Sequence, residues 1–403
     1  MAPDAAAVRT LVADGSSVAA DVAAIVAAVR TGGDAALAGY VERFDATGGA
    51  PVRVLPEELR AALAALDGEV RAGLEVAIEN VGTVARAGIG EPRDVVLPQG
   101  HTVTLREVPV RRAGIYAPGG RNPYPSTVVM GAVTARAAGV EEVVVCAPGS
   151  HPVILAACAL CGVDAVYRMG GAHAVAALAF GTAAIERVDV IAGPGGLWVQ
   201  EAKRAVSGVV GIDGFFGPSD VLVLADASAD AALVAADLLA QAEHGPGTLS
   251  VLCSVDPALL AGVESRLRDA PDTGAVAVTV LVADPDAALG FSDAFAPEHL
   301  ELVGATMEAL APRVRSAGCV FLGRAGATAF GDYVAGSNHS LPTGGAARYA
   351  STLNVRHFRR RMTEVRIPDA AAPALALAGA PLARAEGFTV HAASMEIRQD
   401  GAG

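Results

Sequence analysis

Short runs rich in Val and Ile alternate with apolar stretches of helical spacing between residues 102 and 323. Strand candidates include VTLREV, EEVVVCAP, DVLVLAD and CVFLG, and helix candidates include STVVMGAVTARAAG and ASADAALVAADLLAQAEH. Strands that alternate with helices of about 10 to 15 residues are typical of β-α-β units with parallel sheets. One open sheet would not comfortably hold so many strands, and 403 residues exceed what a single core usually contains. We therefore predict an α/β protein with two Rossmann-like domains and parallel-rich sheets.

Both ends of the chain are predicted to be helical. Apolar residues recur at helical spacing up to about residue 90, with Ser17 as a candidate N-cap and Gly32-Gly33 as a helix stop. After about residue 345, STLNVRHFRRRM and an Ala-, Pro- and Leu-rich stretch again favour helix, in a tail too small for its own core. The predicted organisation is an N-terminal helical segment (1–14), a first α/β domain with the metal and catalytic residues (15–115 and 220–350), a second, dinucleotide-binding α/β domain (116–219) and a C-terminal tail (351–403).

Charge and cysteine content restrict the class of protein. The net charge is −13, from 30 Lys and Arg against 43 Asp and Glu, which disfavours binding to nucleic-acid phosphates. We interpret the dense basic run Arg359-Arg360-Arg361 as a solvated helix face. Five cysteines, an odd number, favour reduced thiols, and no window approaches the roughly 18 apolar residues of a membrane span. We expect a soluble cytoplasmic protein with no nucleic-acid or membrane partner.

Glycines cluster after three of the predicted strands, at 118–120, 170–171 and 193–196. Each cluster alone could be an ordinary tight turn, and none is a GxGxxG motif. Together they lie at the C-terminal ends of strands that lead into helices, where α/β proteins bind phosphate groups. The clusters therefore indicate a phosphate or dinucleotide site between residues 116 and 219.

Four polar segments, QAEH, PEH, GDYVAGSNH and EGFTVH, each pair a histidine with a carboxylate or an amide. Gln241 and His244 have i, i+3 spacing at a predicted helix end and could hold one metal ion. In the alternative interpretation, His244 interacts with the helix dipole and Gln241 lies in solvent. Together with Asp332 and His391 they supply two nitrogens and two oxygens, which suits Zn²⁺, with Mn²⁺ or Co²⁺ as alternatives.

Glu298 and His299 form a compact acid and base pair in a predicted loop after Pro297. A histidine can accept the proton of an alcohol as hydride leaves, and a neighbouring carboxylate can orient it or activate water. The alternative is a solvent-exposed pair at a helix start.

These segments resemble the motifs of the histidinol dehydrogenase family. GIYAPGGRNPYPSTVVM, DVIAGPGG, GPSDVLVLAD, QAEHGPG, APEHLEL, GDYVAGSNHSLPT and EGFTVHAASMEIR follow the family's order and spacing over nearly the whole chain. The resemblance implies a zinc-dependent enzyme that oxidises L-histidinol to L-histidine through the aldehyde and reduces two NAD⁺. It also implies an intertwined homodimer that exchanges its C-terminal tails, so that one metal ligand comes from the partner.

The matching positions imply a role for each candidate residue. The implied zinc ligands are Gln241, His244, Asp332 and His391; the catalytic pair is Glu298 and His299; Ser219, His339 and Glu386 contact the substrate, as do the zinc ligands and His299; and Tyr116, His173 and Gly196 lie at positions that contact NAD.

Two of the cofactor positions depart from the family pattern. His173 stands where the family usually has Gln, and Gly196 where it usually has Asn. GIDGFFGPSD, with Phe215 and Phe216, is more aromatic than usual and would reshape the wall leading to Ser219. Two alternatives follow: a paralogue that oxidises another amino alcohol or polyol, and a non-catalytic zinc-binding scaffold, against which the presence of Glu298 and His299 argues.

Overall fold

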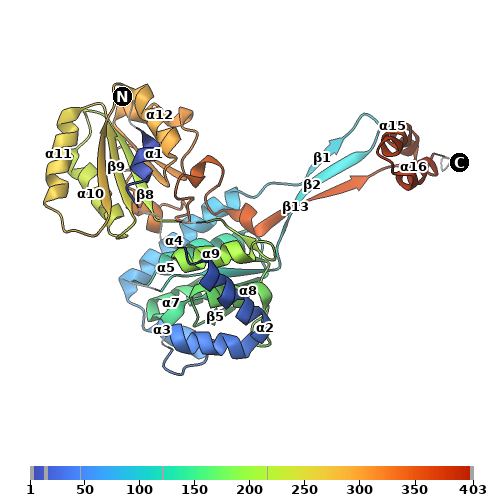
Figure 1. Cartoon of the computed structure of the whole chain (residues 1–403), viewed down its shortest axis with the longest axis horizontal. Helices are drawn as coiled ribbons and strands as arrows, with labels where there is room; N and C mark the ends of the chain where they lie inside the picture. Colours follow the sequence, from blue (N-terminus) through green and yellow to red (C-terminus); the bar gives the residue numbers. More distant parts are fainter. Residues whose placement is uncertain (1–3, 13–16, 46, 120–121, 216, 400–403) are drawn as a thin grey trace. The chain divides into compact units, whose positions relative to one another are not determined.

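The computed structural model describes residues 4–12, 17–45, 47–119, 122–215 and 217–399. It divides into two compact units (Figure 1). Unit 1 comprises Met1–Gly88 and Val110–Phe358, and unit 2 comprises Ile89–Pro109 and Arg359–Gly403.

Unit 1 contains a first five-stranded sheet, in the order β5-β4-β3-β6-β7, in which all pairs are parallel. The chain builds β3, β4 and β5 outward in one direction and then places β6 on the other side of β3. This reversal creates a topological switch point between β3 and β6, where α/β proteins usually bind ligands. The strands are β3 (Arg112–Tyr116), β4 (Glu142–Cys146), β5 (Ala165–Tyr167), β6 (Val190–Ala192) and β7 (Gly211–Ile212).

A second five-stranded parallel sheet in unit 1 has the equivalent order β10-β9-β8-β11-β12. Its switch point lies between β8 and β11. The prediction of two Rossmann-like, parallel-rich sheets is therefore confirmed. The strands are β8 (Asp220–Ala225), β9 (Leu249–Ser254), β10 (Val276–Leu281), β11 (His299–Val303) and β12 (Cys319–Leu322).

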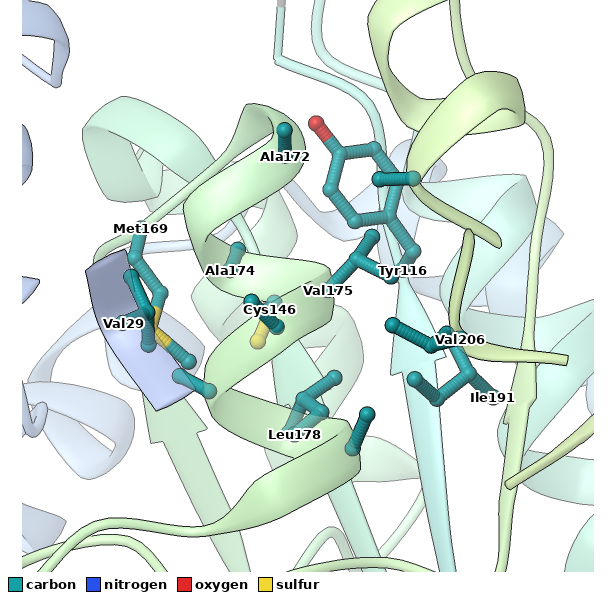
Figure 2. Packing of buried hydrophobic residues seen from close by; sticks show 14 of the residues in the cluster. Val29, Tyr116, Cys146, Met169, Ala172, Ala174, Val175, Leu178, Ile191 and Val206 are labelled. Atoms are coloured by element: carbon teal, nitrogen blue, oxygen red, sulfur yellow. The ribbon is translucent and has the colours of Figure 1, made fainter. Parts of the chain in front are cut away.

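The N-terminal helices cover the first sheet. The long helix α2 (Ala19–Phe44) packs against α8 (Gly171–Phe180) and α9 (Leu197–Val206). Similarly, α3 (Pro56–Ala64) packs against α7 (Pro152–Leu160). Figure 2 shows the resulting core, in which Val29 of α2, Leu178 of α8 and Ile191 of β6 take part.

This packing corrects the predicted domain boundaries, which grouped 15–115 with 220–350. Within residues 15–115, β3 is itself a strand of the first sheet. The helix α4 (Gly68–Ala87) also belongs with that sheet, because it packs on the helix that follows β3. The apolar stripe of α2 is buried against α8, and a stripe alone does not specify which sheet it covers. Gly33 does not end α2 but forms a kink within it, with φ of +53°. By contrast, the short helix α1 (Ala5–Arg9) packs on α12 (Pro285–Phe295) of the second sheet.

Among the described residues, α2 is the one helix long and apolar enough to span a membrane by length and composition. Its apolar side chains Val22, Val29 and Val41 are buried in the core of the first sheet. The same composition is found in core helices of proteins that do not span membranes.

Unit 2 contains an antiparallel three-stranded sheet, in the order β1-β2-β13, and two helices that pack on each other. The helix predicted over 351–362 is wrong, because Arg359–Arg361 begin β13 and pair along β2. Arg106 also bridges Glu364 across this pairing, at 2.5 Å. The elements are β1 (Arg93–Val96), β2 (Thr102–Pro109), β13 (Arg359–Arg366), α15 (Ala372–Ala385) and α16 (Thr389–Glu396).

Candidate functional site

His299 begins β11, an interior strand of the second sheet, and Glu298 immediately precedes that strand. His299 is the first residue of the strand, beside Cys319 of β12 and Val221 of β8. The pair was predicted in a loop: Glu298 does lie in the bend that follows Ala296, whose φ is +49°, whereas His299 is already part of the strand. Glu298 is 6% exposed and His299 is 3% exposed, so the alternative of a solvent-exposed pair is wrong.

The Glu298 carboxylate is held by two donors from the start of β8. The hydroxyl of Ser219 donates to Oε2 at 2.5 Å, and the backbone N–H of Asp220 donates to the same atom at 2.9 Å. Burial raises the pKa of Glu298 to about 7, although the charge of His299 opposes this effect. A carboxyl group with such a pKa can gain or lose a proton near neutral pH.

The two ring nitrogens of His299 have different neighbours. Nδ1 lies 3.3 Å from the backbone carbonyl oxygen of Asp220, and Nε2 lies 3.5 Å from Oδ1 of Asp332. Burial by itself lowers the pKa of His299, but the carboxylates of Glu298 and Asp332 outweigh it and raise the pKa to about 9.

Gln241 has a buried carbonyl oxygen that has no hydrogen-bond partner among the described residues. Its side chain lies on the last turn of α10 (Ala231–Ala242), and Nε2 donates to the hydroxyl of Ser219 at 2.5 Å. This bond fixes the amide and leaves Oε1 buried and unpaired. Gln241 is only 1% exposed, so the alternative that placed it in solvent is wrong. A buried oxygen left unpaired costs about 1 to 3 kcal/mol unless a ligand occupies it.

Asp332 lies in the short helix α14 (Thr328–Tyr333) rather than in a loop. Burial raises its pKa, but the hydrogen bond and charge of His299, together with the charges of His339 and His244, lower it overall. His244 lies just beyond the end of α10, with Nδ1 3.0 Å from the backbone oxygen of Gln241. Three of the four polar segments therefore converge around Asp332.

Among the described residues, no group of three or more His, Cys, Asp or Glu side chains could hold a metal ion. The expected donors in unit 1 include only two side chains of these types, His244 and Asp332, together with the amide of Gln241. The expected fourth donor, His391, belongs to α16 of unit 2 and is exposed there, as is Glu386 after α15.

The predicted dinucleotide residues lie at the carboxyl edge of the first sheet. Tyr116 ends β3, and its hydroxyl accepts a hydrogen bond from Gly171 N–H at 2.9 Å. Gly196 is the N-cap of α9, and a Cβ at this position would have no neighbour within 4 Å. The described glycines of the three clusters thus follow β3, β5 and β6, as predicted; Gly120 lies outside the described residues.

The His173 side chain is paired with another side chain of the same chain. Its Nε2 lies 2.7 Å from Oδ2 of Asp45, and the ring stacks near Tyr40 and Phe44, with centroid distances of 5.9 and 6.1 Å. The side chain is 2% exposed. The structure thus shows a histidine that ties α8 to the end of α2. The contact with NAD that the resemblance implies at this position stays a prediction.

The aromatic segment before Ser219 is described only in part. The guanidinium of Arg204 lies 4.5 Å from the ring centroid of Phe215. Phe216 lies outside the described residues.

Asp220, which no sequence motif indicated, organises the Glu298–His299 pair. Its Oδ1 accepts a hydrogen bond from Glu298 N–H at 2.8 Å, and its Oδ2 pairs with Arg9 at 2.9 Å. Asp220 is 1% exposed. A charged residue at the head of the otherwise apolar strand DVLVLA was the available signal, because a buried charge requires partners.

Comparison with known proteins agrees with this architecture. The family model described as histidinol dehydrogenase matches residues 9–399. Histidinol dehydrogenase of Parasynechococcus marenigrum is 45% identical over 411 residues, covering 97% of this chain and 93% of the relative. That of Thermobifida fusca is 43% identical and covers 92% of this chain and 89% of the relative. The crystal structure of histidinol dehydrogenase from Elizabethkingia anophelis superposes with a TM-score of 0.93 at 30% identity, covering 99% of this chain and 97% of that one. The resemblance seen in the sequence is thereby confirmed, and the chain belongs to the histidinol dehydrogenase family.

Proposed function

We propose that this protein oxidises L-histidinol to L-histidine through histidinal, in two NAD⁺-linked steps that belong to histidine biosynthesis. One observation carries the proposal: the hydroxyl of Ser219 connects the buried acid Glu298 to the amide of Gln241, whose Oε1 is unpaired. An acid and base pair is thus connected to an oxygen that is available to a metal ion, in a member of the histidinol dehydrogenase family.

The donor set fits zinc. Gln241 and Asp332 offer oxygens, and His244 and His391 offer nitrogens, the mixed set that Zn²⁺ accepts. The pKa of Asp332 is lowered, so the carboxylate is in the ionised form that a metal requires. Bound zinc would supply a fixed point that orients the imidazole and amine of the substrate.

His299 is the proposed general base for alcohol oxidation. Its Nε2 takes the hydroxyl proton while hydride passes from the carbinol carbon to NAD⁺. When Asp332 binds zinc, its carboxylate raises the pKa of His299 less. The pKa of His299 then moves toward neutrality, where a general base is effective.

Glu298 is the proposed base for the second step. Water must add to the aldehyde before a second hydride can leave, and the Glu298 carboxylate, with a pKa of about 7, can accept the proton of that water. His299 then accepts the hydroxyl proton of the hydrate as hydride leaves. Overall, histidinol, water and two NAD⁺ give histidine, two NADH and three protons.

NAD⁺ is proposed to bind at the switch point of the first sheet. The turns after β3, β5 and β6 meet there, and Gly119 and Gly170 both pack on Pro148. Backbone N–H groups at helix starts such as those of α8 and α9 favour phosphate groups. Because His173 is bonded to Asp45, Tyr116 and Gly196 are the residues expected to face the dinucleotide.

A homodimer that exchanges its C-terminal tails is proposed to complete the site. Leu377 of α15, Val390 of α16 and Ile397 at the C-cap of α16 are 76%, 78% and 74% exposed, and apolar surface of this kind favours a partner. His391 lies on the same helix as Val390. We therefore propose that His391 and Glu386 act in the site of the second copy, in a soluble cytoplasmic enzyme without nucleic-acid or membrane partners.

Steady-state kinetics test the proposal. The expected result is two NADH per L-histidinol, lost on treatment with a chelator and restored by zinc. This chain has His173, bonded to Asp45, where the family usually has Gln, and this difference favours one alternative, a paralogue. A panel of amino alcohols and polyols is therefore assayed in parallel. Turnover of another alcohol without turnover of histidinol would assign the paralogue. Zinc binding without NADH formation from any alcohol would assign a non-catalytic scaffold.

A further inference from the structure

Lys203 and Asp213 form a buried ion pair beside the switch point of the first sheet. Lys203 lies on α9 and Asp213 follows β7, and both side chains are 0% exposed. Removing two charges from water costs several kcal/mol per ion. Further hydrogen bonds are needed to offset this cost. Both Lys203 and Asp213 form such a bond with the same residue.

That residue is Gly193, in the turn between β6 and α9. Lys203 Nζ donates a hydrogen bond to the Gly193 carbonyl oxygen at 3.1 Å, and Gly193 N–H donates to Oδ2 of Asp213 at 2.6 Å. The ion pair therefore holds both backbone polar groups of a single glycine. Two residues further on, the turn is held again, since Gln200 Nε2 donates to the Gly195 carbonyl at 3.1 Å.

Gly193 has a conformation that only glycine adopts readily. Its φ is +126°, and a Cβ at this position would lie 2.2 Å from the carbonyl oxygen of Tyr116. The turn after β6 thus lies directly against the end of β3. Figure 2 shows the Tyr116 ring at the end of β3, above Val175 and near Ala172 of α8. The Tyr116 hydroxyl in turn accepts the N–H of Gly171, so the turns after β3, β5 and β6 are connected at this point.

From these contacts we propose that Lys203 and Asp213 are positioning residues for the dinucleotide, because they fix the peptide groups of the Gly193 turn before the ligand arrives. The inference rests on the proposed NAD⁺ site. We call the Lys203–Asp213 pair bound to Gly193 the clamp. A turn that is already ordered loses less conformational freedom on binding, so the clamp should lower the dissociation constant of NAD⁺. Neither residue is expected to contact the reacting atoms.

The test replaces both charges together. Lys203→Met with Asp213→Leu exchanges a buried ion pair for apolar side chains, a change that is often neutral for stability, but it leaves Gly193 without its two partners. Binding is followed without turnover through Trp198, the only tryptophan of the chain, at the second position of α9 and 43% exposed. The expected result is a rise of about tenfold or more in the NAD⁺ dissociation constant. The KM for histidinol and the kcat at saturating NAD⁺ should stay within about twofold of wild type, because the catalytic residues lie in the second sheet.

A graded variant and a matched control separate positioning from stability. Lys203→Met with Asp213→Asn keeps an acceptor for Gly193 N–H, so it should raise the dissociation constant by less than the first double variant does. The control is Arg112→Met with Glu142→Leu, an ion pair at the amino ends of β3 and β4 in the same sheet, with side chains 4% and 31% exposed. Its NAD⁺ affinity should equal that of wild type. Equal weakening in the control, or unchanged NAD⁺ affinity in the folded double variants, would overturn the clamp.

The wild-type titration separates this inference from the proposed function. If NAD⁺ does not bind to the wild-type protein, the proposed function fails whatever the variants do. If the wild type binds NAD⁺ and the double variants bind it equally well, only the clamp fails.

Discussion

His299 directs Nδ1 toward the backbone carbonyl oxygen of Asp220, 3.3 Å away. A carbonyl oxygen can only accept a hydrogen bond, so this contact favours a proton on Nδ1 in the charged ring and in the neutral ring alike. Once the ring is neutral, the lone pair is therefore on Nε2, so β8, the neighbouring strand of the sheet, favours the tautomer that a general base needs.

Replacing His299 with alanine should abolish alcohol oxidation while zinc is retained. Loss of a positioned base typically costs about 10² to 10⁴ in rate, and His299 is not among the expected zinc ligands. NADH formation from L-histidinol and the zinc content of the purified variant are the two measurements. Turnover within about tenfold of wild type would remove His299 from the role of base.

Replacing Gln241 with leucine should weaken zinc binding, because it removes the one buried carbonyl oxygen at the site that lacks a hydrogen-bond partner among the described residues. The zinc affinity should fall by more than about tenfold, as measured by competition with a chromophoric chelator. Gln99→Leu, at an exposed position of unit 2, is the control and should bind zinc like the wild type. Equal zinc affinity in the two variants would exclude Gln241 as a ligand.

Mixing two inactive variants should restore activity if the tails are exchanged. His299→Ala and His391→Ala each inactivate every site of their own homodimer. In a mixed dimer, however, one site combines the intact His299 of one copy with the intact His391 of the other. NADH formation is measured after the variants are unfolded and refolded together, with each variant refolded alone as the control. A mixture as inactive as its components would show that His391 acts within its own chain or not at all.

Replacing Asp226 with asparagine should destabilise the second sheet in a pH-dependent way. The carboxylate follows β8 and accepts hydrogen bonds from Ser228 N–H at 2.9 Å, from the Ser228 hydroxyl at 2.6 Å and from Thr306 N–H at 3.0 Å. Burial acts to raise the pKa of Asp226, but these bonds outweigh it and lower the pKa below its ordinary value. Because the folded state favours the ionised form, the stabilisation is complete above the ordinary pKa and is lost as the pH falls through the lowered one.

At neutral pH the loss in the free energy of unfolding should be about 1 to 3 kcal/mol, and the difference should shrink below about pH 4. Thermal unfolding midpoints across this pH range provide the measurement. Asp286→Asn, on a carboxylate whose side chain is 73% exposed, is the control and should change the midpoint little. A constant difference between Asp226→Asn and wild type at all pH values would contradict the role of the charge.

The parallel sheets were predictable because local sequence determines them. Buried parallel strands are apolar throughout, and the runs that became β4 and β8 have no other reasonable interpretation. The prediction failed at β11, because His299 and Glu301 interrupt the apolar pattern with the polar residues that a site requires. Functional residues at a strand end thus obscured the strand that carries them.

Pairings that are distant in sequence were not predictable. Arg359 contacts Glu107 across 252 positions, and nothing local distinguishes such a basic run in a strand from one on a helix. His173 likewise finds Asp45 across 128 positions, so its burial could not be inferred from the sequence. By contrast, the grouping of three of the four polar segments around Asp332 was expected from their residue types, and the place of the fourth, EGFTVH, stays a prediction.

The sheet of unit 2 pairs an early segment of the chain with a late one, so it cannot be completed until the late segment has been synthesised. β1 and β2 leave the ribosome long before β13, so the edge of β2 has no partner while most of unit 1 is being made. An unpaired edge of this kind invites pairing with other strands. A nascent chain would therefore carry a β-hairpin with an unpaired edge until its last segment emerged. Premature termination before residue 359 would produce aggregation-prone fragments that also lack His391.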